Sequence, residues 1–178
     1  MDTSSTPSPA PHDDAAALPS AAVQAVWPER VDAGPHAVAY RLAVAAPAEE
    51  LWGQLADPHR HHEVDGSGTV KQKVTGPHRL AVGDRFTVAM AKFGVPYRMS
   101  NTVTRAEPGR VIEWRHPGGH RWRWEFRDLG DGRTEVTETF DYSGLPKAAM
   151  RAHELVRTPQ DNARGIRASL TRLAARHL

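Results

Sequence analysis

Aromatic and charged side chains alternate along residues 120–127, which read His-Arg-Trp-Arg-Trp-Glu-Phe-Arg. Successive side chains of a β-strand point to opposite faces. The histidine, the two tryptophans and the phenylalanine therefore share one face of a predicted strand, and the charged residues share the other. A face with so much ring surface must either be buried in a core or line a ligand pocket, and the pattern alone leaves both open.

Strand-like stretches recur along the chain, separated by turns rich in Gly, Pro and Asp. A first strand is predicted from about residue 36 to residue 44, where Val, Tyr, Leu and Val alternate with smaller or charged residues. Short strands at regular spacing with tight turns are typical of an antiparallel meander. Six further strands are predicted, over residues 69–75, 85–93, 97–107, 111–116, 120–129 and 134–142.

Helical patterns lie between the first two strands and at the C-terminus. Pro47 suits the first turn of a helix over residues 48–56, because its missing N–H would have no partner there. A second short helix is predicted over residues 58–64, and the rest of the chain after Gly144 reads as helical with a break at Pro159. A curved sheet with one apolar face needs a cover, so the order predicts an α+β domain of about seven antiparallel strands wrapped around a long C-terminal helix.

Composition divides the chain into two parts. Residues 1–34 are rich in Ser, Pro, Ala and Asp and carry few large apolar side chains, which predicts a disordered tail with a helical turn near residues 21–26. Residues 35–178 are then expected to form one folded domain. The chain has no cysteine, no run of about 20 apolar residues and no signal-peptide pattern at its N-terminus, so we expect a cytoplasmic protein without a membrane span.

The order of elements and several short motifs resemble the START-like (SRPBCC) superfamily, in particular its polyketide cyclase/dehydrase branch. The motifs are Val44-Ala45-Ala46-Pro47-Ala48-Glu49-Glu50-Leu51-Trp52, Leu55-Ala56-Asp57-Pro58, Val82-Gly83-Asp84-Arg85-Phe86, Val111-Ile112-Glu113-Trp114 and Thr134-Glu135-Val136-Thr137. The resemblance covers about residues 36–176. It implies a helix-grip fold with a deep apolar cavity for a lipid, sterol, polyketide or other hydrophobic small molecule. It implies no universal catalytic motif, because fold does not fix function.

Strand alternation gives a set of candidate residues for the walls of such a cavity. Small-molecule sites combine apolar walls with a few placed polar groups. The candidate substrate-binding residues are Met90, Tyr97, Met99, Trp114, His116, Trp122, Trp124 and Phe140 on the strands, with His61 and His62 from the short helix at the cavity mouth.

Glu138, His120 and Asn101 are the candidate catalytic residues. Glu138 shares a face with Val136, Phe140 and Tyr142, and an apolar environment raises the pKa of a carboxyl toward values useful for acid–base catalysis. In this hypothesis Glu138 is the base, and His120, Tyr97 or Asn101 orients and stabilises a substrate oxygen. The alternative is that Glu138 lies at the solvent-exposed end of its strand, or that a β-bulge turns its side chain to the outer face of the sheet.

Two other groups of residues were weighed and set aside. His59, His61, His62 and Glu63 could suggest a metal, but no second cluster with ligand spacing accompanies them, so we expect no metal and no organic cofactor.

Residues 145–178 carry seven basic and two acidic side chains, and Arg121, Arg123 and Arg127 lie beside tryptophans. These arginines are predicted on the face opposite the rings, where Glu113 and Glu135 offer cross-strand partners, so we expect no nucleic acid.

Two classes of function remain open from the sequence. The first is a cofactor-independent polyketide cyclase, aromatase or dehydratase, and the second is a non-catalytic binder or carrier of a hydrophobic ligand. An enzyme needs a buried ionisable group in the cavity, whereas a carrier needs only its walls. The expected partner is a hydrophobic small molecule. The sequence leaves the oligomeric state open, a homodimer included.

Overall fold

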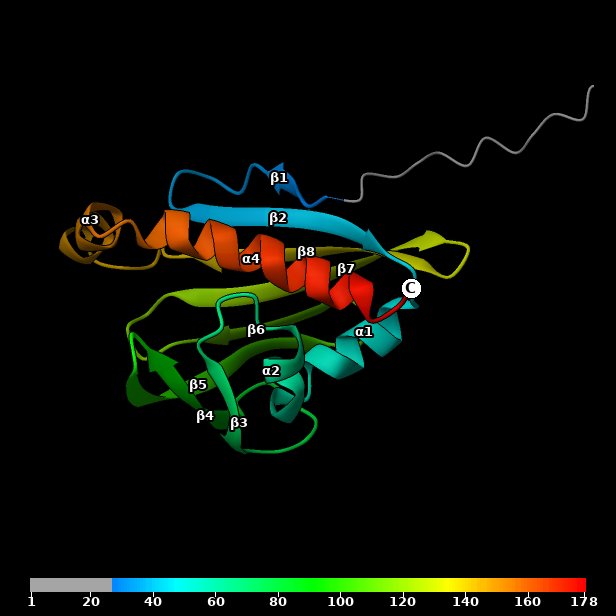
Figure 1. The fold of residues 1–178 in the computed structure, drawn as a ribbon, viewed down its shortest axis with the longest axis horizontal. Coiled ribbons are helices and arrows are strands. Elements are labelled where there is room, and N and C mark those ends of the chain that lie inside the picture. The colour runs from blue at the N-terminus through cyan, green and yellow to red at the C-terminus, as the bar shows by residue number, and fades with distance from the viewer. Residues whose placement is uncertain (1–26) are drawn as a thin grey trace, which may run out of the picture.

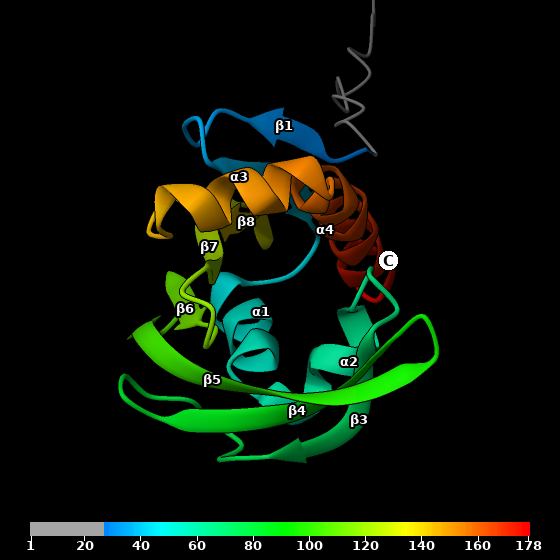
Figure 2. The ribbon, with the colours of Figure 1, turned by 90° about the vertical axis from the view of Figure 1, so that its left-hand side faces the viewer.

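The computed structural model describes residues 27–178, which form one antiparallel sheet of eight strands (Figure 1). The sheet curves, and α1, α2 and α4 lie inside its curve (Figure 2). The strand order is β1-β2-β8-β7-β6-β5-β4-β3. The strands are β1 (Glu29–Val31), β2 (Ala37–Val44), β3 (Val70–Thr75), β4 (Arg85–Lys92), β5 (Val95–Glu107), β6 (Val111–Arg115), β7 (Arg121–Gly130) and β8 (Arg133–Asp141).

The predicted α+β architecture is confirmed, with one more strand than expected. The additional strand is β1, which pairs with β2 through Glu29↔Arg41 and Val31↔Ala39. The sequence analysis assigned residues 29–31 to the tail because three residues are too few to show an alternation. The helical turn predicted near residues 21–26 lies outside the described residues.

The helices match the predicted order but are divided more finely. They are α1 (Ala48–Leu55), the 3-10 helix η1 (Pro58–Arg60), α2 (His61–Val64), α3 (Lys147–Leu155) and α4 (Thr158–Ala175). The predicted break near Pro159 is confirmed: Arg157 is left-handed with φ of 60°, and Pro159 lies in the first turn of α4. Within residues 27–178, none of these helices has the length and apolar character needed to cross a membrane.

The core lies between the sheet and the helices inside its curve. From α4, Ile166, Leu170 and Leu173 are fully buried, and this helix packs on β2 and β8. Helix α1 contributes Trp52, whose indole Nε1–H donates a hydrogen bond of 2.8 Å to the backbone oxygen of Val111 at the start of β6. Because that donor is buried, the bond fixes α1 against the sheet without an unsatisfied polar group.

The outer face of the sheet carries the charges that the alternation predicted there. Arg123 lies opposite Glu113 in the β6–β7 register, with 3.6 Å between their charged groups. Arg127 lies opposite Glu135 in the β7–β8 register, at 3.0 Å. These cross-strand pairs compensate the basic charge on the strand whose other face carries the tryptophans.

The two edges of the described sheet differ in character. One edge is β1, which is only three residues long. The other is β3, where Lys71, Gln72 and Lys73 are exposed and the register with β4 shifts between Val70 and Val74.

The turn between α2 and β3 makes a close contact with α4. The backbone N–H of Gly66 donates to the Ser169 hydroxyl at 2.9 Å, and the Arg172 guanidinium donates to the backbone oxygen of Asp65. A Cβ atom at position 66 would overlap the backbone of Gly165 and Ser169. Only glycine therefore allows this turn to approach α4 so closely.

We expect Gly66→Ala to destabilise the fold by more than about 2 kcal/mol, because backbone atoms must move to admit the methyl group. Gly53→Ala is the matched control, since position 53 lies inside α1 and its added Cβ meets nothing within 4 Å. That substitution should stabilise the protein by roughly 0.5–1 kcal/mol through helix propensity. Urea unfolding followed by tryptophan fluorescence measures both, and a Gly66→Ala protein as stable as the wild type would contradict the assigned contact.

Candidate functional site

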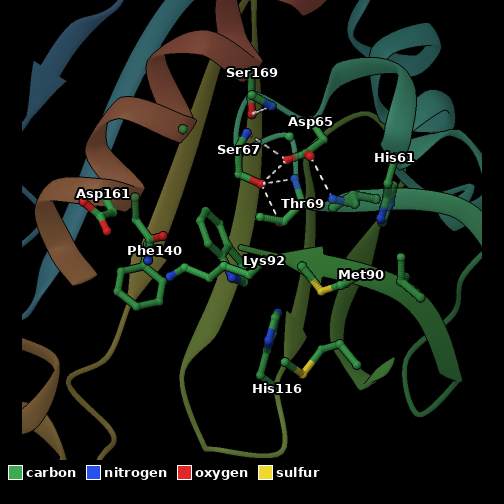
Figure 3. Close-up of a pocket in the computed structure, with 18 of the residues that line it drawn as sticks. His61, Asp65, Ser67, Thr69, Met90, Lys92, His116, Phe140, Asp161 and Ser169 are labelled. Carbon is green, nitrogen blue, oxygen red and sulfur yellow. Dashed lines mark hydrogen bonds between the residues drawn. The ribbon is translucent and has the colours of Figure 1, made fainter. Parts of the chain in front are cut away.

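A pocket of about 950 Å³ lies between the sheet, α4 and the turn that precedes β3. Figure 3 shows Asp65, Ser67 and Thr69 of this turn joined by hydrogen bonds, with Ser169 beside them. Strands β4 to β8 supply the largest share of the wall and α3 and α4 another. Helices α1 and α2, the turn before β3 and Val70 complete it. The pocket therefore depends on the tertiary fold rather than on one contiguous segment.

The structure places all the sequence-predicted site residues except His62 in the lining of this pocket. Strand pairing brings them together, since Trp114 lies opposite Trp122, Trp122 opposite Phe140, and Trp124 opposite Glu138. His62 lies on α2 and does not line the pocket. The predicted residues that line the pocket are Glu138, His120, Asn101, Tyr97, Met99, Met90, Trp114, His116, Trp122, Trp124, Phe140 and His61.

The aromatic face of β7 serves both the core and the pocket. Trp124 is only 3% exposed and belongs to the hydrophobic core, yet it also lines the pocket. Trp122 is partly buried against the same core and its ring lies 5.2 Å from that of Phe140. The two uses that the sequence left open, core and pocket wall, are therefore combined on one strand.

Four polar atoms of pocket-lining side chains are buried and have no hydrogen-bond partner within the described part of the chain. They are Asn101 Oδ1, His116 Nδ1, His120 Nδ1 and Glu138 Oε2. Buried polar atoms are nearly always satisfied in folded proteins, and exceptions are frequent at functional sites. The Asn101 amide Nδ2–H₂ is directed to the Met99 backbone oxygen at 3.4 Å, so the carbonyl oxygen is the atom left without a partner.

Glu138 is a buried carboxyl with a strongly raised pKa. The side chain is 4% exposed, and burial, assisted by the negative charge of Asp65, raises its pKa well above the ordinary value of 4.5, while the Ser169 hydroxyl opposes the rise. Removal from water disfavours the charged form of a carboxyl. The carboxyl is thus biased toward its neutral, proton-donating form.

Three histidines gather at one end of the pocket. The rings of His116 and His120 are 4.4 Å apart, and the ring of His153, from α3, is 5.8 Å from that of His120. Burial, reinforced by His120, lowers the pKa of His116 to about 3. Burial, reinforced by His153, lowers the pKa of His120 to about 4. Both imidazoles are therefore neutral at physiological pH, and each then offers one donor and one acceptor nitrogen.

His61 forms part of the wall rather than a free polar group. Its Nε2 lies 2.8 Å from the backbone oxygen of Leu55, and its ring stacks on Trp114 with the centroids 4.9 Å apart. Burial lowers its pKa, against the opposing effect of the hydrogen bond to Leu55. The neutral ring donates to that carbonyl and packs as an aromatic group.

Several lining residues were missed by the sequence reasoning. The Asp65 carboxylate accepts from Ser67 and from the backbone of Val70, but its place in the pocket depends on a distant contact with α4. Ser169 and His153 lie on the C-terminal helices. The spacing of two small residues, Gly165 and Ser169, beside the buried positions of α4 was the one available signal that a backbone approaches there.

The described residues include one group of side chains close enough to share a metal ion, Asp57, His59 and His78. None of the three lines the pocket. The chemistry available in the pocket itself is that of its carboxyl, imidazole, amide and hydroxyl groups, together with the amine of Lys92 and the guanidinium of Arg164.

A family model described as "Polyketide cyclase / dehydrase and lipid transport" matches residues 35–177. The chain therefore belongs to this family, as its resemblance to the polyketide cyclase-like branch of the START-like superfamily indicated.

Two kinds of relative accompany this match. The "Uncharacterized protein Rv0088" of Mycobacterium tuberculosis is 48% identical over 146 residues, which cover 81% of this chain and 65% of that protein. Among solved structures, Ms6760 from Mycobacterium smegmatis superposes with a TM-score of 0.59 at 19% identity, covering 84% of this chain and all of that one. The ZhuI aromatase/cyclase from Streptomyces sp. R1128 superposes with a TM-score of 0.56 at 19% identity, covering 79% of this chain and 94% of that one. At these identities the solved structures establish the helix-grip fold.

Replacing Glu138 should make stability depend less on pH. A carboxyl whose folded-state pKa is raised above the unfolded value of 4.5 loses stability as pH rises between those two values. Glu138→Gln should therefore resemble the wild type near pH 4.5 and become progressively more stable than it as pH rises. Urea unfolding of both proteins at a series of pH values from 4.5 to 8 measures this, and a constant difference across the series would show that Glu138 does not titrate with a raised pKa.

Proposed function

We propose that the protein binds an uncharged, hydrophobic small molecule in this pocket and acts on it as a cofactor-independent cyclase, aromatase or dehydratase of the polyketide type. The observation that carries the proposal is the buried Glu138 carboxyl, whose Oε2 has no partner within the described residues and faces an aromatic pocket. Membership of the polyketide cyclase/dehydrase family supports the same class of substrate.

The buried polar groups of the pocket favour an uncharged ligand, whereas the cationic lining residues Lys92 and Arg164 are exposed. His116 and His120 are neutral, and the pKa of Glu138 is shifted toward its neutral form. A ligand carboxylate or ammonium would be desolvated in this pocket without a buried counter-charge, which is costly. Hydroxyl and carbonyl groups on a flat apolar skeleton match both the unpartnered atoms and the tryptophan walls.

An aldol-type cyclisation assigns a role to each unpartnered group. Ionised Glu138 takes a proton from a CH₂ group between two carbonyls, and its raised pKa makes it a stronger base than an ordinary carboxylate. The resulting carbanion attacks a second carbonyl carbon of the same molecule, so that a C–C bond forms and the carbonyl becomes an alkoxide. The alkoxide takes the proton back from Glu138, and loss of water from the alcohol completes a dehydration.

The imidazoles and the amide orient the substrate in this scheme. A ring N–H of His120 is suited to hold the enolate oxygen as charge develops there. The free atom of Asn101 is its carbonyl oxygen, so Asn101 is suited to accept a hydrogen bond from a substrate hydroxyl. The tryptophans exclude water, which strengthens each of these polar contacts.

A non-catalytic carrier is the second candidate. The family description includes lipid transport, and the aromatic walls alone are sufficient to retain an apolar molecule. In a carrier, replacing Glu138 would alter affinity but there would be no turnover to lose.

Native mass spectrometry of the purified full chain, followed by denaturing extraction, would test the proposal first. We expect a small uncharged aromatic or polyketone compound bound at one molecule per chain. A protein that purifies without ligand, and whose tryptophan fluorescence ignores a panel of anthraquinones, naphthols and fatty alcohols, would contradict ligand binding in the pocket.

Once a substrate that the wild type turns over is known, we expect Glu138→Gln to lower kcat by at least about 100-fold, as removal of a general acid–base group does. The rate for the wild type should rise with pH as Glu138 ionises. Glu135→Gln is the matched control, since Glu135 lies on the same strand but pairs with Arg127 on the outer face. Equal losses in both variants, or none in Glu138→Gln, would rule out the acid–base role.

A further inference from the structure

Asp57, His59 and His78 form a second cluster of chemically active side chains away from the pocket. One potential ligand atom from each lies within 4.8 Å of the others. Asp57 Oδ2 and His78 Nδ1 are 3.2 Å apart, and the rings of His59 and His78 are stacked with their centroids 4.0 Å apart. The cluster is open to solvent on one side, because the His78 side chain is 75% exposed.

The backbone around the cluster is fixed independently of any ion. The Leu80 N–H donates to the Ala56 oxygen at 2.9 Å, so the segments that carry Asp57 and His78 are joined directly beside them. Asp57 Oδ1 accepts from the His59 backbone N–H at 3.0 Å and caps η1. Contacts within the protein thus already hold these three side chains, from two segments of the chain, close together without a metal ion.

The environment of His59 also selects which of its nitrogens is available. Its Nε2 lies 3.1 Å from the Gly76 backbone oxygen, a partner that favours a proton on Nε2 and leaves the lone pair on Nδ1. Metal-binding histidines commonly donate their second ring N–H to a backbone carbonyl, which fixes the ring and its tautomer.

We propose that Asp57, His59 and His78 bind a divalent transition metal ion, with zinc as the expected occupant. Two imidazoles and one carboxylate are a donor set typical of zinc. Zinc bonds of about 2.0–2.1 Å in a tetrahedron place neighbouring ligand atoms roughly 3.3 Å apart, which is close to the separation of Asp57 Oδ2 and His78 Nδ1. The exposed His78 ring turns out of its stack to direct its nitrogen at the ion, and water completes the coordination.

The sequence analysis considered a different set of ligands and expected no metal. In the structure His61 is hydrogen-bonded to the backbone oxygen of Leu55, and Glu63 forms ion pairs with Arg60 and Arg176. Neither side chain is therefore available to bind a metal together with His59. The third ligand instead comes from His78, in the loop before β4. This loop approaches η1 only in the folded chain.

Zinc binding would link the loop before β4 to η1, and η1 leads directly into His61 in the pocket wall. The metal site would therefore stabilise the wall of the pocket from outside, without contacting a ligand bound in the pocket. This proposal is independent of the reaction in the pocket, because its test measures binding and stability of the full chain rather than turnover.

Titration of zinc chloride into the full chain by isothermal calorimetry, after removal of any histidine tag, tests the proposal. We expect one ion per chain, and a rise in Tm of about 5–10 °C at a hundred-fold excess of free zinc over Kd. His78→Ala and Asp57→Asn should each weaken binding by more than about 10-fold, since even the loss of a supporting partner commonly costs that much. Asn at position 57 keeps an acceptor for the cap of η1.

Two controls locate the ion. His36→Ala removes a half-exposed histidine that pairs with Glu154 instead, and it should bind zinc like the wild type. His120→Ala tests the three histidines of the pocket and should also leave binding unchanged. The proposal is overturned if the wild type takes up no stoichiometric zinc, if His78→Ala binds as tightly as the wild type, or if His120→Ala alone abolishes binding. Because His78 is exposed, its substitution leaves the fold intact for this comparison.

Discussion

The contact between the Gly66 backbone and α4 fixes the geometry on which the pocket depends. The sheet is open: β3 and β1 lie at its two ends, and within residues 27–178 the helices inside the curve lie between these ends (Figure 2). At Gly66 the turn before β3 approaches the α4 backbone so closely that no side chain fits between them. The hydroxyl that accepts the hydrogen bond from the Gly66 N–H belongs to Ser169, and it also opposes the rise in the pKa of Glu138 that burial causes. One contact therefore sets both the separation of the two halves and the surroundings of the buried carboxyl.

Local patterns predicted most of the fold because each acts over few residues. Alternation along residues 120–127 assigned the tryptophans and the arginines to opposite faces, and strand pairing then placed Trp124 opposite Glu138. Pro159 indicated the break between α3 and α4. The strand β1 was missed because its three residues show no pattern of their own and are defined only by pairing with β2.

The candidate site was predictable where a strand face determines it and hidden where two distant segments meet. Alternation carries Asn101, His116 and Glu138 into the pocket, so the sequence was sufficient to select them. Ser169 reaches the pocket through a helix packing against a turn, and His78 reaches Asp57 through a loop that folds back on η1. Such contacts have no periodicity along the chain, so only the tertiary structure reveals them.

Burying Glu138 and the two histidines lowers stability at any pH at which the unfolded chain would carry their charges. Natural proteins tolerate such groups chiefly where they serve function. The core around these groups consists mainly of tryptophans, phenylalanines and aliphatic side chains, while Gln54 and Glu113 are polar side chains buried elsewhere. Among the described residues, Glu138, His116 and His120, whose pKa values are strongly shifted by burial, are thus gathered in the pocket.

The two edges of the sheet limit how the protein can meet other chains. An exposed strand edge is a template for further strands, and long flat apolar edges promote aggregation. Here one edge is a strand of only three residues, and the other carries Lys71 and Lys73 and has an irregular register. Neither offers a long uncharged ladder to a neighbouring molecule. Edge-to-edge pairing of two copies of the described sheet is therefore disfavoured at both ends.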